Sequence, residues 1–284
     1  MITVRNLSHS YSKDGKMAVN DISFEIERGE TFGFLGPSGA GKSTTQGVLT
    51  GLLKLQKGEV TVAGYDLNKV RNERFNKIGV SFEQSNVYSK LTALENLKYF
   101  ADLFDVPTRD PHELLALVGL EGREKDRAGS FSKGMKHRLT FARSMINRPE
   151  LWFLDEPTTG LDPAIAATIK DIIKEEKAKG TTTFLTTHNM YIADELCDRV
   201  AFIIDGEIRL IDTPRNLKQR FGQKLIEVEY IADSRPVKET LKTIDDGDRR
   251  KLAGIVTSYD IVTMHSKEAT LEEIFIQVTG RGLL

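Results

Sequence analysis

The stretch Phe32-Gly-Phe-Leu-Gly36-Pro-Ser-Gly-Ala-Gly-Lys42-Ser43 decides the fold of this 284-residue chain. From Gly36 onward it matches the pattern G-x-x-x-x-G-K-[ST] in full, after an apolar run and before a segment of helical character. Glycines let the backbone turn its N–H groups inward around phosphates, and the N-terminus of the next helix adds a favourable dipole. We therefore predict a strand, a phosphate-binding loop and a helix that bind a nucleoside triphosphate. The predicted nucleotide contacts come from Gly36, Pro37, Ser38, Gly39, Ala40, Gly41, Lys42, Ser43 and Thr44.

A second apolar run, Leu151-Trp-Phe-Leu, ends in the carboxylates of Asp155 and Glu156. Such a pair is usually solvated surface. Beside a phosphate loop, however, a strand tip can place Asp155 at a Mg²⁺ ion while Glu156 polarises the attacking water. Lys42 would then reach the β- and γ-phosphates, and the Ser43 hydroxyl would bind the Mg²⁺. Together the two motifs predict hydrolysis of a nucleoside triphosphate with Mg²⁺.

The apolar runs indicate the fold class. Those at 32–35, 151–154, 183–185 and 200–204 are typical of strands buried on both faces, which favours a mostly parallel core sheet covered by helices. Ile22, Phe24 and Ile26 alternate with polar residues, which indicates an antiparallel β layer beside that sheet. The predicted fold class is therefore α/β.

Two changes of pattern predict the domain organisation. Between about 88 and 146, apolar residues recur at helical spacing without strand signals, so we expect a helical subdomain inserted in the core. After 220 a half-exposed strand pattern begins, and near the end Thr270 and Glu273 form a capping-box pattern, with Gly280 as a stop. The sequence thus predicts an ATP-binding domain at 1–220 and a small α+β accessory domain at 221–284.

Composition limits the partners and the compartment. A net charge of -1 gives no electrostatic case for nucleic-acid binding. The single cysteine, Cys197, cannot form an internal disulfide, which favours a reducing cytoplasm. The apolar runs are far shorter than the ~20 residues that span a bilayer. We expect a cytoplasmic chain that could still dock onto a membrane protein.

The order of further motifs resembles that of the ABC ATPases. Phe131-Ser132-Lys133-Gly134-Met135 resembles the signature motif of this family. Glu156-Pro-Thr-Thr-Gly-Leu-Asp162 resembles its catalytic acid followed by its D-loop, and Thr187-His188-Asn189 resembles its switch-histidine loop. The resemblance covers about residues 1–220 and implies the P-loop ABC-ATPase fold.

The resemblance implies a role for each matching position. Tyr11 would stack on adenine, although by itself it would pass for a strand aromatic. Ser132 and Gly134 would contact the γ-phosphate of an ATP held by the opposite subunit. His188 would hydrogen-bond the γ-phosphate and sense its departure. The other histidines, His137 among them, are expected to be structural.

Two departures from the family pattern bear on function. Lys133 and Met135 stand where the commonest signature has glycine and glutamine, a variant that resembles the ATPases of ABC-2-type exporters. In the Q-loop, Glu83 falls at the position of the usual glutamine, with Gln84 next to it. Either side chain offers an oxygen to Mg²⁺ or to the attacking water. Glu83 is the favoured Q-loop ligand, and Gln84 remains the alternative.

The resemblance also implies partners. Two cassettes, identical or merely related, would close head to tail around ATP and drive a membrane permease. We therefore expect the energy-coupling subunit of a transporter, most simply an exporter, peripheral on the cytoplasmic face of the membrane. The alternative is a soluble ABC ATPase that acts on nucleic acid or ribosomes. A long coiled coil or a second cassette in the chain would favour it, and the sequence has neither.

Overall fold

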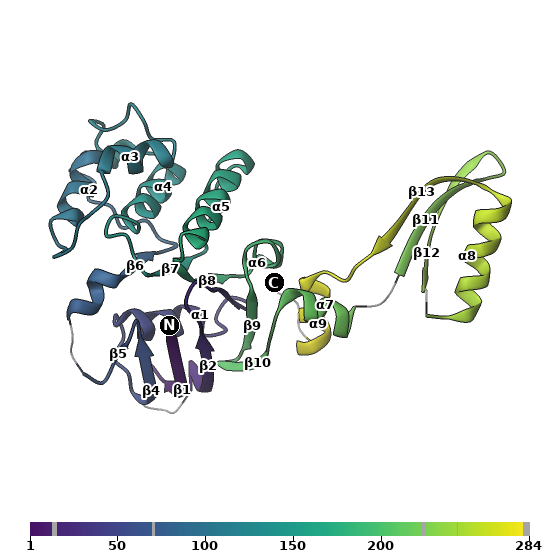
Figure 1. Ribbon diagram of the computed structural model, residues 1–284, viewed down its shortest axis with the longest axis horizontal. Coiled ribbons are helices and arrows are strands. Elements are labelled where there is room, and N and C mark those ends of the chain that lie inside the picture. Colours follow the sequence, from purple (N-terminus) through teal and green to yellow (C-terminus); the bar gives the residue numbers. More distant parts are fainter. Residues whose placement is uncertain (13–15, 70–71, 223–224, 243, 281–284) are drawn as a thin grey trace. The chain divides into compact units, whose positions relative to one another are not determined.

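The computed structural model describes residues 1–12, 16–69, 72–222, 225–242 and 244–280 (Figure 1). These residues form two compact units, the first from Met1 to Thr213 and the second from Pro214 onward. The sequence placed this boundary a few residues later, after 220. The difference is the helix Pro214–Phe221, which packs against the helix Leu271–Thr279 and so belongs to the second unit.

A six-stranded sheet lies at the centre of the first unit, in the order β10-β9-β3-β8-β7-β6. Strands β6, β7, β8, β3 and β9 are parallel, and β10 pairs antiparallel with β9. The strands are β3 (Thr31–Leu35), β6 (Ile78–Ser81), β7 (Leu151–Asp155), β8 (Thr182–Thr187), β9 (Arg199–Ile204) and β10 (Glu207–Asp212). The four apolar runs of the sequence all lie in this sheet, which confirms the predicted parallel core.

Register brings the carboxyl ends of three strands together. Leu35, the last residue of β3, is paired with Thr187 of β8, and Asp155 of β7 is paired with Thr186 of β8. Carboxyl ends of adjacent parallel strands are where ligands bind in open α/β sheets. The phosphate loop, the two carboxylates and the switch-histidine loop therefore begin at one edge of the sheet.

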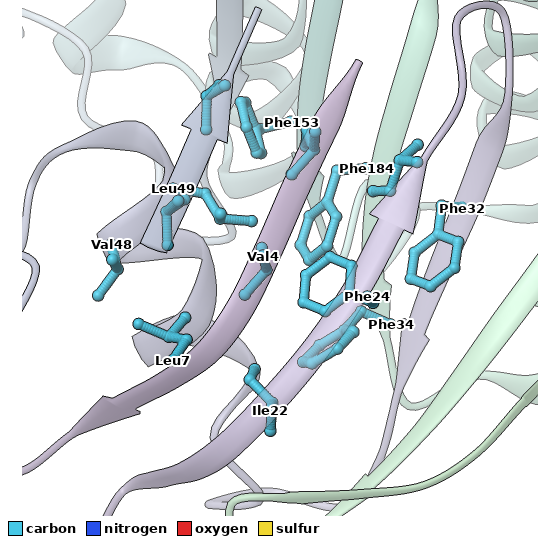
Figure 2. Close-up of a cluster of buried hydrophobic side chains, with 14 of the residues drawn as sticks. Val4, Leu7, Ile22, Phe24, Phe32, Phe34, Val48, Leu49, Phe153 and Phe184 are labelled. Atoms are coloured by element: carbon cyan, nitrogen blue, oxygen red, sulfur yellow. The ribbon is translucent and has the colours of Figure 1, made fainter. Parts of the chain in front are cut away.

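A second sheet, in the order β2-β1-β4-β5, is the predicted antiparallel layer. Its strands are β1 (Ile2–His9), β2 (Val19–Ile26), β4 (Lys57–Val62) and β5 (Tyr65–Asp66). Phe24 of this layer stacks on Phe32 of the core sheet with ring centroids 5.6 Å apart, and Phe34 and Phe184 join the same buried cluster (Figure 2). Burial of these large rings between the two sheets fixes β3, and with it the start of the phosphate loop.

Helices complete the first unit (Figure 1). Two helical segments, α1 (Lys42–Thr50) and the 3₁₀ helix η1 (Asn72–Lys77), connect one sheet to the other, whereas α5 (Pro163–Ala178) and α6 (Met190–Leu196) connect strands of the core sheet. Residues 88–146 contain α2 (Ala93–Ala101), α3 (Pro111–Leu117), the 3₁₀ helix η2 (Ala128–Ser130) and α4 (Lys133–Arg143). Between 88 and 146, where every residue is described, no strand occurs apart from one isolated bridge. The region is therefore helical, as predicted.

The second unit contains a three-stranded antiparallel sheet in the order β12-β11-β13. Its elements are α7 (Pro214–Phe221), β11 (Leu225–Ala232), β12 (Arg235–Lys242), α8 (Asp246–Ser258), β13 (Asp260–Lys267) and α9 (Leu271–Thr279). A small core of Val228, Tyr230, Leu241 and Ile255 joins α8 to the sheet. Thr270 and Glu273 form the predicted capping box, and Gly280 ends α9 in the left-handed conformation.

Candidate active site

The phosphate loop connects β3 to α1, and its glycines are required by its geometry. A Cβ atom on Gly36 would lie 2.2 Å from the carbonyl oxygen of Ile203, so no larger residue fits there. Gly41 precedes α1 with φ +110°, a conformation that L side chains rarely adopt. No side chain caps the helix N-terminus, so its first N–H groups can serve a bound anion.

Lys42 is folded back over the loop. Its Nζ donates to the carbonyl oxygens of Gly36 at 2.7 Å and Pro37 at 3.0 Å. Burial lowers the pKa of Lys42, while the three nearby carboxylates of Glu156, Asp155 and Glu83 act in the opposite direction. The ammonium group thus lies among carboxylates and carbonyls, and phosphate oxygens could replace these partners.

Asp155 ends β7 half-buried, and a neighbouring threonine holds it. The Thr186 hydroxyl donates to Asp155 Oδ1 at 2.5 Å. The pKa of the Asp155 carboxyl is raised, because burial and the charges of Glu156 and Glu83 outweigh the hydrogen bond from Thr186 and the charge of Lys42. A partly buried carboxylate that repels a second carboxylate is a suitable place for a divalent cation.

Four donors hold the Glu156 carboxylate, which is almost fully buried. Its Oε1 accepts from the backbone N–H of His188 at 2.8 Å and lies 2.6 Å from Nδ1 of the same residue. Its Oε2 accepts from the hydroxyls of Thr187 at 2.8 Å and Thr159 at 3.0 Å. Glu156 has φ +47°, in the left-handed region that is strained for a non-glycine residue.

His188 lies at the end of β8 with its side chain 54% exposed. Because Nδ1 faces Glu156, Nε2 is the ring nitrogen left to meet a phosphate. Asn189 follows as the N-cap of α6, where its Oδ1 accepts from Tyr191 and Ile192. The cap fixes the turn from which the imidazole projects.

Tyr11 lies beside the first turn of α1. Its hydroxyl is 3.2 Å from the Thr44 hydroxyl, and its ring is 68% exposed. The Tyr11 and His9 rings form a T-shaped pair with centroids 5.1 Å apart. An exposed aromatic face next to the phosphate loop is compatible with stacking on a base.

A cleft of about 460 Å³ joins the Q-loop, the signature motif and the D-loop. The residues that line it include Glu83, Gln84, Lys133, Gly134, His137, Thr159 and Leu161. Gly134 lies against Leu161, since a Cβ atom there would be 3.6 Å from it. Ser132 caps α4 by accepting from Met135 N at 3.2 Å, and Asp162 caps α5 by accepting from Ile165 N at 3.1 Å.

Comparisons with known proteins agree with this geometry. The sequence model of the ABC transporter family matches residues 19–159. The chain is 49% identical over 285 aligned positions to a fluoroquinolones export ATP-binding protein of Mycobacterium tuberculosis, covering 100% of this chain and 94% of that protein. It is 32% identical to the linearmycin resistance ATP-binding protein LnrL of Bacillus subtilis, covering 100% and 99%. Among solved structures, the fold is similar to that of the ATP-binding cassette MJ0796, solved as a dimer in a post-hydrolysis state with ADP and Pi. The TM-score is 0.69 and the sequence identity 26%, and the match covers 75% of this chain and 98% of that one.

The chain belongs to the ABC transporter family. It is an ATP-binding subunit, an ATPase whose hydrolysis is coupled to transport. Among the residues that the structure describes, no helix is long and apolar enough to cross a membrane.

The donor set of this ABC subunit fits a Mg²⁺ ion. In the described part of the chain no three His, Cys, Asp or Glu side chains cluster as a complete metal cage. Mg²⁺ in phosphate-transfer sites does not need one, because one or two carboxylates, waters and the substrate phosphates surround it. Asp155 and Glu83 offer carboxylates, and the exposed Ser43 offers a hydroxyl at the start of α1.

Several contacts of the candidate site were missed from sequence. The hydroxyls of Thr159 and Thr187 donate to Glu156 and that of Thr186 donates to Asp155, and in sequence these threonines look like ordinary β-branched residues. The available signal was weak: Thr186 and Thr187 directly precede His188, and Thr159 follows Glu156 by three residues. His137, expected to be structural, is indeed buried, but neither ring nitrogen has a hydrogen-bond partner among the described residues.

Proposed function

We propose that this subunit powers an exporter, by closing head to tail with a second cassette around two MgATP molecules and docking onto a membrane permease. The two curated relatives bear names of export and resistance proteins, and this chain spans 94% and 99% of their length. The observation that carries the proposal is an apolar groove beside the Q-loop, of a kind that fits a helix of another protein.

Each residue of the nucleotide site has a place in this proposal. Lys42 binds the β- and γ-phosphates, while Ser43 and Asp155 hold Mg²⁺. Glu156 is the general base, and His188 presents Nε2 to the γ-phosphate. The adenine stacks on Tyr11.

Glu83 is the Q-loop ligand in this proposal. Its charge acts on both Lys42 and Asp155, which supports a position facing the metal. A carboxylate is also a harder ligand for Mg²⁺ than the amide of Gln84.

Dimer closure uses the start of α4. Ser132 and Lys133 are exposed there, and the N-terminus of α4 carries the partial positive charge that favours a phosphate. The similar MJ0796 cassette was solved as a dimer with ADP and Pi. We propose the same arrangement here, with either an identical or a related partner cassette, and no nucleic acid.

The groove has a volume of about 590 Å³ and lies between η1, the Q-loop and the helical insertion. Its lining is mainly apolar and includes Leu52, Phe75, Phe100, Leu103 and Phe104. Leu52 is 66% exposed and Leu103 is 59% exposed. An apolar groove with exposed aliphatic side chains fits the apolar face of a helix, so we propose that a cytoplasmic helix of the permease lies in it.

Arg143 shapes one wall of this groove. Its guanidinium is buried, lies 4.1 Å from the centre of the Phe100 ring and donates to the carbonyl oxygen of Asn86 at 2.8 Å. These two contacts join the Phe100 wall of the groove to the Q-loop.

Site-directed cross-linking tests the proposal. Cys197 is buried, and burial raises the pKa of its thiol, so a cysteine introduced at Leu103 would be the reactive one. In membranes that contain the permease from the neighbouring reading frame, Leu103→Cys should cross-link to it. Tyr191→Cys, at a site 73% exposed outside the groove, is the matched control. Equal cross-linking at both sites, or none at Leu103, would refute the groove as the docking site.

A further inference from the structure

Gln46 is a buried polar side chain in α1, behind the phosphate loop. It is 2% exposed, and its Oε1 lies 3.1 Å from the hydroxyl of Thr186. Its Nε2 has no hydrogen-bond partner among the described residues. Thr186 is fully buried on β8 and holds Asp155. Gln46 therefore lies two hydrogen bonds away from the carboxylate that we assign to Mg²⁺.

Proton counting shows that this contact needs a particular orientation of the amide. The Thr186 hydroxyl has one proton, and it lies near three acceptors: Gln46 Oε1 at 3.1 Å, the Leu154 carbonyl at 3.2 Å and Asp155 Oδ1 at 2.5 Å. The shortest and charge-assisted partner, Asp155, takes the proton. Oε1 then faces a hydroxyl oxygen with no proton between them. The oxygen and nitrogen of a glutamine amide are assigned from the hydrogen-bond network, so the network decides their order.

We propose that Gln46 donates from Nε2 to Thr186 Oγ1, which in turn donates to Asp155 Oδ1, and that this relay positions the carboxylate for Mg²⁺. Exchange of the two amide atoms gives Nε2 of Gln46, the Thr186 hydroxyl and Asp155 Oδ1 each a donor or acceptor role that it can fill. Oδ1 is then held by the protein, and Oδ2 is left for the metal. Gln46 and Thr186 are positioning residues, and their role rests on the proposed role of Asp155.

A purely structural role does not account for the amide. A leucine or methionine in α1 would fill the same buried volume without an unpaired polar atom, which a buried site disfavours. The contact with Thr186 is the one hydrogen bond of the Gln46 side chain within the described residues. What the amide contributes is therefore directed at Thr186 and, through it, at Asp155.

The test measures how much Mg²⁺ strengthens ADP binding, by calorimetry with excess Mg²⁺ and with a chelator instead. Thr186→Val should reduce the Mg²⁺-dependent gain in ADP affinity by about tenfold, the low end of the 10–100-fold loss typical when a partner of a metal ligand is removed. Gln46→Leu should reduce it by roughly threefold to tenfold, and ADP affinity without metal should not change. Thr186→Ser keeps the hydroxyl and should restore the gain. The double variant should match Thr186→Val, because the two residues act in series.

The matched control is Thr183→Val. Thr183 lies on the same strand and is equally buried, but its hydroxyl has no partner in the described chain, so the Mg²⁺ gain should stay intact. Gln46→Met replaces Gln46→Leu if the latter does not fold. An unchanged Mg²⁺ gain in both Gln46 and Thr186 variants would overturn the relay. Asp155→Asn tests the assignment of Asp155 to Mg²⁺ separately from the relay. If Asp155→Asn abolishes the Mg²⁺-dependent gain in ADP affinity and Thr186→Val does not, only the relay fails. If Asp155→Asn leaves the gain intact, the metal assignment fails and the relay with it.

Discussion

Replacement of Glu156 by glutamine separates catalysis from binding at this site. The amide has the shape of the carboxylate but cannot take a proton from water. General-base catalysis contributes about 10²- to 10⁴-fold to a rate, so Glu156→Gln should lower kcat by that factor. ATP binding should persist, because no phosphate contact is lost. With hydrolysis blocked, the MgATP-bound dimer should accumulate.

The contacts of Glu156 predict how well the variant folds. A glutamine oxygen can accept from the His188 N–H, as Oε1 does at 2.8 Å, and its NH₂ group can donate to the Thr187 hydroxyl, which rotates to accept. We expect the free energy of unfolding to change by less than about 1.5 kcal/mol. Glu156→Ala instead removes the acceptor from all four donors; the exposed Thr159 hydroxyl and His188 ring can turn to water, which leaves the Thr187 hydroxyl and the His188 N–H to count. At about 1–3 kcal/mol for each buried unpaired group, partly relieved by water at His188, the loss should be roughly 2–4 kcal/mol.

Three measurements check this prediction. Phosphate release gives kcat, urea unfolding gives the free energy of unfolding, and sedimentation with MgATP gives the fraction of dimer. Wild-type turnover in Glu156→Gln would remove this residue from the catalytic role. Equal destabilisation by glutamine and alanine would refute the assigned donors.

Further predictions concern the loop and the fold. Lys42→Ala should weaken ATP binding by about tenfold or more, measured by titration with a fluorescent ATP analogue, because a hydrogen bond from a charged group contributes about 1.5–3 kcal/mol. Gly36→Ala should lower the free energy of unfolding by about 1–3 kcal/mol or prevent folding, because the added Cβ would be 2.2 Å from a carbonyl oxygen. In the same urea assay the control Gly254→Ala should be neutral or stabilising, because its Cβ would meet nothing within 4 Å. Burial alone would raise the pKa of Glu176, but the Arg109 ion pair holds it below the usual value. The stabilisation by Glu176 is therefore fully present above the pKa of about 4.3 that glutamate has in the unfolded chain, and it is lost as the pH falls through the lower pKa of the folded state. Glu176→Gln should accordingly make the free energy of unfolding depend less on pH below about pH 4.3.

The parts of the site that could be predicted from sequence share one property: their chemistry and their backbone context lie in the same short segment. Gly36 to Ser43 contains the loop, the lysine and the helix start, and Leu151 to Glu156 contains a strand and its carboxylates. Parallel strands then bring these segments to one edge without any further information. For this reason the core sheet, its antiparallel layer and the helical insertion all followed from local pattern.

Contacts that depend on register could not be predicted in this way. Thr186 reaches Asp155 because β7 and β8 pair those two residues, and neither segment encodes the pairing by itself. Gln46 is polar at a helix position that becomes fully buried, and its partner is 140 residues away. The second unit was predicted only as α+β, since β12 and α8 are so exposed that their patterns are weak.

The Q-loop is one short segment that faces both places where partners are proposed to bind. Phe82 and Asn86 line the apolar groove, whereas Glu83, Gln84 and Ser85 between them line the cleft beside the signature motif and the D-loop. Arg143 fixes Asn86 at one end, and the charge of Glu83 acts on Lys42 and Asp155 at the other. A helix seated in the groove and a metal–nucleotide complex at Lys42 and Asp155, as proposed above, would both act on the conformation of residues 82–86. If both partners bind as proposed, this shared segment would give a coupling free energy that is reciprocal: the factor by which nucleotide changes the affinity for the permease equals the factor by which the permease changes the affinity for nucleotide.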